Sequence, residues 1–353
     1  MKNPQQKAKV ATSILLVDWP AEGKKFWLAD ELRRKGFNVI LEGIENFNSK
    51  NTEVKWRKLI LWGQYFALGW RGAKKAKHHN GVILSWSFIP GIFAAIILKF
   101  FFMKDLKVIA LNMIARKKGI IIETIRDYIY KLAFKKTDIF ITVNSKEMRE
   151  KYINKYDIHQ DKIAILQDPY SIPTSILKPN YSDYVFSGGE AARDWDTVIK
   201  VAQKCPDIPF VVIARRKYWD HSKEIPVNLK VYFDTSEEEF YGKVANSRLV
   251  ILPLNSDVTA GLIVLKASIL MGKAVITTET PATINYYPPE CRSLLLPMGD
   301  AERLSSVLQQ LWHNDEERLI KANLLQEYIR QHFSPASFAS RVADLLTKQI
   351  PKF

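Results

Sequence analysis

The stretch of the sequence best suited to bind an anion is FSGGEAARDW, residues 186–195. An apolar run that predicts a buried strand leads into Gly188 and Gly189, and a helix is expected to follow, with Arg193 in its first turn. A cation is unfavourable at the positive end of a helix dipole, so a structural role explains Arg193 poorly. Glycines, helix N–H groups and an arginine together predict a phosphate site, although a plain strand-to-helix turn can share the pattern.

A second group of cations ends the next apolar run, VVIARRKYW, at residues 211–219. Arg215, Arg216 and Lys217 follow one another there. Cations at the carboxyl end of a buried strand, together with Arg193, predict a site for a diphosphate. A solvated basic loop is the alternative interpretation.

A third stretch of interest covers residues 250–280, where a strand is followed by a polar loop and a helix that begins near Gly261. This helix start offers further N–H groups to an anion. Asp257 and Thr259 in the loop could bind hydroxyl groups, and Thr259 could also act simply as the helix N-cap.

Apolar runs alternate with helical patterns along most of the chain, which predicts parallel sheets covered by helices on both faces. Prolines and small polar residues interrupt this alternation once, which predicts an interdomain linker. We therefore expect an α/β protein with two Rossmann-like domains whose parallel sheets face a cleft. The expected parts are a domain at 1–170, the linker at 171–183, a domain at 184–335 and a helix at 336–353 that could cross back to the first domain.

The positive charge of the chain is unevenly distributed. The formal net charge is +15, and residues 1–180 hold 32 Lys and Arg against 16 Asp and Glu. A basic half attracts nucleic acid, anionic lipid or a phosphorylated substrate, or it is only a solvated face. The helix expected at 54–77 interleaves aromatic and basic side chains, which favours a helix on an anionic membrane surface. No RNP, zinc-finger or helix-turn-helix pattern occurs, so nucleic acid is not the expected partner.

The sequence also favours a cytoplasmic protein, peripheral on the inner face of the membrane. The N-terminus lacks the apolar core of a signal peptide, and the longest apolar run, at 88–103, is too short to span a bilayer. Cys205 and Cys291 form no CxxC pair, so neither a disulfide framework nor a zinc site is indicated.

The order of these segments resembles the donor-binding domain of GT-B glycosyltransferases and is most similar to glycosyltransferase family 4. The resemblance covers about residues 181–345 and is strongest at 248–280. In that family, two glutamates flank the glycine that matches Gly261, one reaching the donor sugar and the other the ribose. Here these positions are Val258 and Lys266. Asp257 could replace the first acid, whereas a lysine cannot accept hydrogen bonds from ribose hydroxyls.

The resemblance implies a donor-binding set on the strand ends of the second domain. Arg193 matches one of the family's phosphate-binding cations, and Arg215 or Lys217 could supply the other. The implied set is Gly188, Gly189, Arg193, Arg215, Lys217, Thr235, Asp257, Thr259, Ala260, Gly261 and Lys266.

The first domain resembles the acceptor-binding domain of the family less specifically. Asp18 is the best candidate for a general base and Asp168 the second, if the enzyme inverts; the alternative is that Asp18 is only a loop or N-cap acid. The implied residues on the acceptor side are Gly23, Lys24, Trp86 and Asn112.

The function implied is transfer of a hexose from a nucleotide-sugar to a lipid-linked or polysaccharide acceptor at the cytoplasmic membrane face. The nucleotide-sugar is a substrate, so no cofactor is expected, and cations and helix ends could replace a metal ion. Two alternatives stay open: a sugar-nucleotide epimerase of the same architecture, and a non-catalytic binding protein derived from a transferase.

Overall fold

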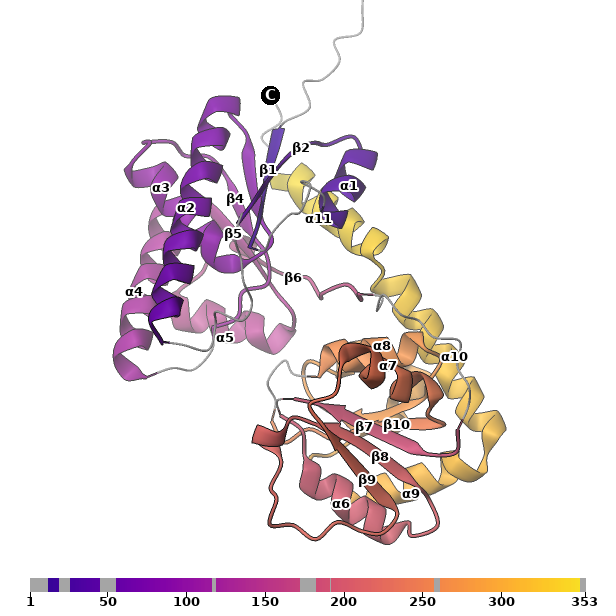
Figure 1. Ribbon diagram of the computed structural model, residues 1–353. Helices are drawn as coiled ribbons and strands as arrows, with labels where there is room; N and C mark the ends of the chain where they lie inside the picture. The colour runs from indigo at the N-terminus through magenta and orange to yellow at the C-terminus, as the bar shows by residue number, and fades with distance from the viewer. Residues whose placement is uncertain are drawn as a thin grey trace, which may run out of the picture. The chain divides into compact units, whose positions relative to one another are not determined.

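A computed structural model describes residues 12–18, 26–44, 55–115, 119–171, 182–190, 192–256 and 261–349. Six residues discussed above lie outside these ranges, as does most of the expected linker: Gly23, Lys24, Asp257, Val258, Thr259 and Ala260. The chain divides into two compact units (Figure 1). The N-terminal unit comprises residues 1–168 with 335–353, and the C-terminal unit comprises 169–334.

The described part of the N-terminal unit contains a six-stranded parallel sheet with the strand order β2-β1-β3-β4-β5-β6. Its strands are β1 (Thr12–Val17), β2 (Asn38–Gly43), β3 (Val82–Ser85), β4 (Val108–Ala110), β5 (Ile139–Val143) and β6 (Ile163–Ile165).

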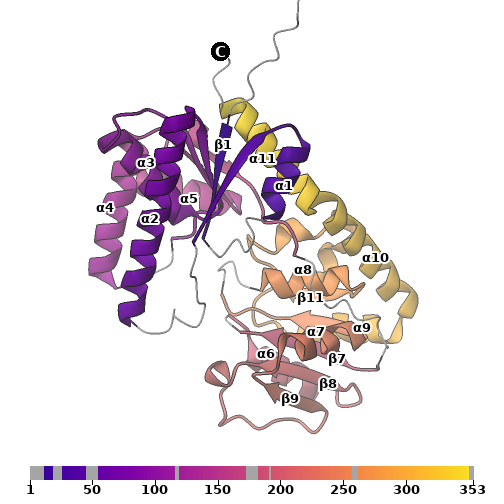
Figure 2. The ribbon, with the colours of Figure 1, turned by 45° about the horizontal axis from the view of Figure 1, so that its top comes forward.

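Helices cover both faces of this sheet, which explains why its strands are apolar throughout (Figure 2). Ile14 and Leu16 of β1 pack toward one set of helices, and Leu15 and Val17 pack toward the other. The first set is α2 (Lys55–His79), α3 (Phe88–Phe100), α4 (Ile120–Lys136) and α5 (Lys146–Tyr156). The second set is α1 (Trp27–Arg34) and the C-terminal helix α11 (Pro335–Gln349).

The described part of the C-terminal unit contains a second six-stranded parallel sheet, in the order β12-β11-β10-β7-β8-β9. Its strands are β7 (Val185–Gly189), β8 (Phe210–Ala214), β9 (Leu229–Phe233), β10 (Leu249–Leu252), β11 (Val275–Thr278) and β12 (Leu295–Leu296). Its helices are α6 (Trp195–Lys204), α7 (Glu237–Asn246), α8 (Leu262–Leu270), α9 (Ala301–His313) and α10 (Asp315–His332). The α/β class with two Rossmann-like units is as predicted; the sequence analysis missed only the two-residue strand β12.

Each sheet has one point where the chain reverses the direction in which strands are added. In the C-terminal unit, strands are added from β7 toward β9, and the chain then returns to place β10 on the other side of β7. In the N-terminal unit, the corresponding point lies between β1 and β3. Open α/β sheets bind ligands beyond the carboxyl ends of the strands at such a point. These two places are therefore where functional side chains are expected.

Candidate functional site

The loops that follow β7 and β10 join each other at the reversal point of the C-terminal sheet. Arg193 forms an isolated antiparallel β-bridge with Leu254. The Asp194 amide donates a hydrogen bond to the Pro253 carbonyl at 3.0 Å, and the Asn255 amide donates to the Ala192 carbonyl at 3.2 Å. The backbone around Arg193 is thus fixed on both sides, which holds its side chain in one place.

Arg193 is buried, with only 5% of its surface exposed. Its Nε donates to the Gly188 carbonyl at 2.8 Å. Burial lowers the pKa of the guanidinium to about 10, so the group stays protonated at neutral pH. A cation already removed from water interacts more strongly with an anion than a solvated cation does.

Two glycines leave the space that this guanidinium occupies. A Cβ atom on Gly189 would lie 2.4 Å from Arg193 Nη2, and one on Gly261 would lie 2.8 Å from Nη1. Both glycines also have positive φ angles, +133° and +80°, which side chains disfavour. The structure therefore brings together Gly188, Gly189, Arg193 and Gly261, four of the predicted donor-site residues.

The sequence analysis was wrong in placing Arg193 in the first turn of a helix. Helix α6 begins at Trp195, and Asp194 is its N-cap, because the Asp194 carboxylate accepts a hydrogen bond from the Thr197 amide at 3.0 Å. Arg193 precedes the helix, so the argument from the dipole of α6 does not apply. Its suitability for an anion comes from its burial and its place at the strand end.

Helix α8 presents its N-terminus beside the same guanidinium. Gly261 is the N-cap of α8, and no side chain caps that end among the described residues. Thr259, the N-cap candidate of the sequence analysis, lies outside the described residues. The contact between Gly261 and Arg193 places the positive end of the α8 dipole next to a buried cation, and both attract an anion.

The cations after β8 are held differently from Arg193. Arg215 forms an ion pair with Glu190, which is in the loop after β7; its Nε lies 2.6 Å from Glu190 Oε1. Its Nη1 lies 3.8 Å from Asp234 Oδ1. The hydrogen bond that Arg215 donates to the Glu190 carboxylate raises the pKa of Arg215. The Lys217 ammonium is exposed and lies 4.9 Å from the Tyr218 ring centroid. Carboxylates already neutralise Arg215, so an anionic ligand would compete with them.

Two other predicted donor-site residues lie in distinct environments. Thr235, which follows β9, has a buried hydroxyl with no hydrogen-bond partner among the described residues. Lys266 is buried in α8, where its ammonium donates to the Pro169 carbonyl at 2.8 Å and lies 5.5 Å from the Tyr286 ring. Lys266, which the sequence analysis aligned with a ribose-binding position, thus contacts the first residue of the C-terminal unit.

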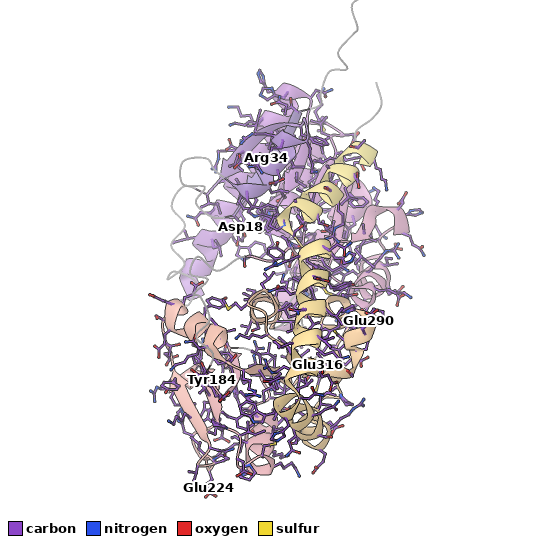
Figure 3. The ribbon with its side chains drawn as sticks, turned by 90° about the vertical axis from the view of Figure 1, so that its right-hand side faces the viewer. Asp18, Arg34, Tyr184, Glu224, Glu290 and Glu316 are labelled. Carbon is purple, nitrogen blue, oxygen red and sulfur yellow. The ribbon has the colours of Figure 1, made fainter. Side chains whose placement is uncertain are left out.

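Asp18 occupies the reversal point of the N-terminal sheet, directly after β1 (Figure 3). Burial raises the pKa of its carboxyl, and a hydrogen bond from the Ser87 side chain partly offsets that effect. Ser87 follows β3 and is the N-cap residue of α3. Burial raises the pKa of Tyr65 to about 12, with a smaller contribution from the charge of Asp18. Sequence reasoning missed Ser87 and Tyr65; a serine before an apolar helix was the one signal for the former.

Trp86 and Asn112 follow β3 and β4, the two successive strands on one side of β1. The indole of Trp86 packs against Phe26, Trp27 and Phe338, with ring centroids 5.3–5.7 Å apart, so it closes the face covered by α1 and α11. Asn112 has a left-handed backbone, φ 57°, and its amide donates to Thr142 Oγ1 at 3.1 Å. Among the residues that the structure describes, the buried Oδ1 of Asn112 has no hydrogen-bond partner.

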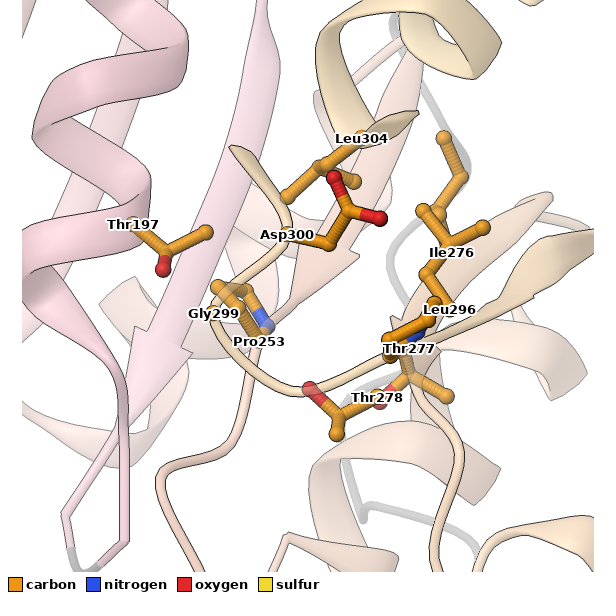
Figure 4. Close-up of a pocket in the computed structure, with 10 residues that line it drawn as sticks. Thr197, Pro253, Ile276, Thr277, Thr278, Leu296, Gly299, Asp300 and Leu304 are labelled. Atoms are coloured by element: carbon orange, nitrogen blue, oxygen red, sulfur yellow. The ribbon is translucent and has the colours of Figure 1, made fainter. Parts of the chain in front are cut away.

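A small hollow lies at the carboxyl ends of β10, β11 and β12 (Figure 4). Thr197, Thr278, Gly299 and Asp300 are among the residues that line it. It has room for about one water molecule. It shares no residue with the predicted donor site, so we interpret it as a packing defect.

The described residues contain no cluster of three or more His, Cys, Asp or Glu side chains that could hold a metal ion. Nor do the helices described here include one with the length and hydropathy needed to cross a bilayer.

Comparison with solved structures shows the fold. The chain is similar to a glycosyltransferase from Rickettsia africae, with 12% identity over 98% of this chain and 100% of the other at a TM-score of 0.66. A crystal structure of Anabaena Alr3699/HepE in complex with UDP matches with 12% identity, 96% and 100% coverage and a TM-score of 0.67. Sucrose-phosphate synthase from Thermosynechococcus elongatus matches with 10% identity, 96% and 98% coverage and a TM-score of 0.64.

No protein-family model matches the sequence, and no curated protein matches it either. The likeness is therefore one of structure along nearly the whole chain. Two Rossmann-like units with parallel sheets, matched end to end by these enzymes, establish that the chain has the GT-B glycosyltransferase fold.

Proposed function

We propose that the protein is a glycosyltransferase that moves a hexose from a nucleotide-sugar to an acceptor. The observation that carries the proposal is the buried Arg193 guanidinium at the reversal point of the C-terminal sheet, between two glycines and beside the start of α8. A fixed cation and a helix N-terminus suit the two charges of a leaving nucleoside diphosphate. Because these groups supply positive charge, we expect transfer without a divalent metal.

A uridine diphosphate donor is the most specific choice that the similar structures support. Alr3699/HepE from Anabaena has been crystallised with UDP, with UDP-glucose, and with UDP and glucose. We infer by this likeness that the present chain takes a UDP-hexose. Arg193 would bind the diphosphate, the backbone at Gly188 and Gly189 would approach it closely, and the Thr235 hydroxyl would bind the nucleoside side of the donor.

The remaining predicted donor residues would act from the start of α8. Asp257, Thr259 and Ala260 precede Gly261, so they would bind the hexose hydroxyls or the phosphates. Arg215 and Lys217 would contribute only long-range attraction, since Arg215 is paired with Glu190 and Lys217 is exposed.

Asp18 would be the general base if the reaction inverts the anomeric centre. Its carboxyl lies at the ligand-binding edge of the N-terminal sheet, and burial raises its pKa toward the range where a base is effective. Asn112 would orient the acceptor through its unpartnered Oδ1. The hydroxyl proton of the acceptor would pass to Asp18 as the acceptor oxygen bonds to the anomeric carbon and the diphosphate leaves.

The acceptor proposed is a lipid-linked or polysaccharide saccharide at the cytoplasmic face of the membrane. The basic, aromatic helix α2 supports a peripheral position there, because such helices bind anionic headgroups. Gly23 and Lys24, in the loop after β1, would then take part in acceptor binding.

A turnover assay across UDP-, GDP- and ADP-hexoses tests this function. We expect release of UDP from a UDP-hexose in the presence of EDTA. The turnover rate of an Arg193→Ala variant should be at least about a hundredfold lower. Loss of wild-type activity in EDTA would remove the metal-independent mechanism, and absence of turnover with every donor would remove the transferase itself.

One observation favours a non-catalytic binding protein as the second candidate. Lys266 occupies the family's ribose position and is engaged with the Pro169 carbonyl. Tight binding of a nucleotide-sugar without release of its nucleotide, in the same assay, would favour this candidate.

A further inference from the structure

We propose that the outer face of the layer formed by α2, α3 and α4 is a docking surface for an anionic lipid membrane. We call it the α2–α4 surface; the three helices lie side by side over one face of the N-terminal sheet (Figures 1 and 2). The proposal names the surface through which the proposed glycosyltransferase would bind the membrane. It rests on the proposed function only for the reason why the protein binds there.

Helix α3 is apolar on the side that faces away from the sheet. Ile89, Phe93 and Ile96 are half-buried there, and Phe100 on the same stripe is exposed. These positions follow the spacing of a single helix face. A helix that covers a sheet normally turns polar residues outward, whereas this face is apolar. Ile89, Phe93 and Ile96 also pack against the core of the N-terminal unit, so only the exposed part of this face is open to a partner.

Aromatic side chains extend the apolar face from α3 onto α2. Phe93 packs against Trp62 and Phe66 of α2, with ring centroids 5.9 and 5.6 Å apart. Further along, Trp70 packs against Phe101 at 5.6 Å, and Phe101 is 61% exposed. Aromatic rings partly open to solvent are suited to the boundary between headgroups and acyl chains.

Helix α4 continues the surface with exposed aliphatic and aromatic residues. Ile122, Ile125 and Tyr128 are all exposed, Tyr128 to 70%. The last turns of the same helix carry the exposed cations Lys131, Lys135 and Lys136. One half of α4 is thus fitted to apolar material and the other half to anionic groups.

Nearly all the excess positive charge of the protein lies in this part of the chain. Residues 55–136 contain 17 Lys and Arg against 3 Asp and Glu, a net of +14 out of +15 for the whole chain. Exposed cations border the apolar residues, among them Lys74, Lys77 and Lys131. Such a combination is complementary to a surface that is both anionic and apolar.

The charge also argues against a second copy of the chain as the occupant. Two copies meeting through this surface would bring net charges of the same sign together, which opposes association. Nucleic acid would form ion pairs with the lysines but would leave the exposed Ile122, Ile125 and Phe101 in water. An anionic lipid membrane would bind the lysines through its headgroups and the apolar side chains through its acyl chains.

Vesicle flotation tests the proposal with two kinds of variant. The wild-type chain is expected to float with vesicles of phosphatidylcholine containing roughly one third phosphatidylglycerol, and at least about tenfold more weakly with phosphatidylcholine alone. The triple variant Ile122→Ser, Ile125→Ser, Tyr128→Ser should lose at least about tenfold in affinity for the anionic vesicles. The charge variant Lys74→Glu, Lys77→Glu, Lys131→Glu should lose at least as much.

A matched control removes exposed apolar side chains from the C-terminal unit. Ile225 and Val227 are exposed in the loop that precedes β9, and they belong to the other unit of the chain. The variant Ile225→Ser, Val227→Ser should float like the wild type. All variants change exposed residues, and a circular dichroism spectrum and a melting temperature like those of the wild type show that the fold of each is intact.

Three results would overturn the proposal. Equal flotation with neutral and anionic vesicles would show that the positive charge does not contribute to binding. If the apolar triple variant floats like the control, the α2–α4 surface is not the site of membrane binding. Binding of single-stranded RNA that the charge variant abolishes, with no vesicle binding by the wild type, would show a nucleic-acid surface instead. If flotation behaves as expected and no donor binds, the docking surface stands and the proposed transferase fails.

Discussion

The two units repeat one architecture but place groups of opposite charge at the same point of it. Each has a six-stranded parallel sheet, and in each the first strand ends at the place where the strand order reverses. The N-terminal unit has Asp18 there, after β1, and the C-terminal unit has Arg193, after β7. Burial acts on both, and it raises the pKa of the acid while it lowers that of the arginine.

This difference suits the two units to different chemical roles. A carboxyl whose pKa is raised is a better proton acceptor, which suits activation of a hydroxyl group. A desolvated arginine that stays charged suits an anion, here the proposed diphosphate. The positive charge that dominates the composition belongs to neither point, since it lies mainly on the helices of residues 55–136.

Replacing the acid of the N-terminal unit should give the largest effect. Asp18→Asn is expected to reduce the rate of transfer at least about a hundredfold, with UDP binding unchanged, because a base is lost on the acceptor side alone. Wild-type transfer should rise with pH through the raised pKa of Asp18, since the base must first lose its proton, and the variant should lack this rise. Asp30→Asn, in an exposed ion pair with Arg33, is the control. An unchanged pH profile in Asp18→Asn would exclude the role.

Filling the space beside Arg193 should be the next largest effect. Gly189→Ala is expected to reduce the free energy of unfolding by about 2–3 kcal/mol, since both its φ angle and the guanidinium oppose a Cβ. Gly299→Ala is the matched control, because Gly299 has a φ of +75° but open space around it; about 1 kcal/mol is expected there. Urea denaturation measures both. Equal losses would show that Arg193 does not fill the space.

Salt should separate the buried cation from the exposed ones. Raising sodium chloride from about 50 to about 500 mM is expected to weaken vesicle binding at least about tenfold but UDP binding less than about threefold, because exposed charges are screened and buried ones much less so. Flotation and calorimetry at the two salt concentrations give the comparison. Equal sensitivity would place the UDP site among exposed lysines.

The smallest effect is expected at the ribose. With Lys266 donating to the Pro169 carbonyl and valine at position 258, removal of the 2′-hydroxyl should weaken UDP binding less than about threefold. Calorimetry with 2′-deoxy-UDP measures this. A loss above about tenfold would show that another acidic or backbone group binds the ribose.

The sequence predicted the two-domain α/β class because its strands are apolar throughout and alternate with helices. It also identified Gly188, Gly189, Arg193 and Gly261 as neighbours, since all of them end or follow strands of one parallel sheet. It did not show that Arg193 lies before α6, because the capping role of Asp194 is decided by the geometry of its side chain.

Contacts between residues far apart in sequence could not be read from local pattern. The ion pair of Arg215 with Glu190 depends on the pairing of β7 with β8. The contact of Lys266 with Pro169 joins residues 97 positions apart. The outward apolar face of α3 was also hidden, because a helix that is apolar on every side gives no amphipathic signal until its neighbours are known.

Binding of UDP to Arg193→Gln and Arg216→Gln shows whether the buried arginine holds the diphosphate. Both variants remove one positive charge from strand ends of the C-terminal sheet, but Arg193 is buried at the reversal point and Arg216 is exposed beside Asp234. Calorimetry should show a loss of at least about thirtyfold for Arg193→Gln, equivalent to about 2 kcal/mol, and less than about threefold for Arg216→Gln. Equal affinities in the two variants would contradict the proposed diphosphate site.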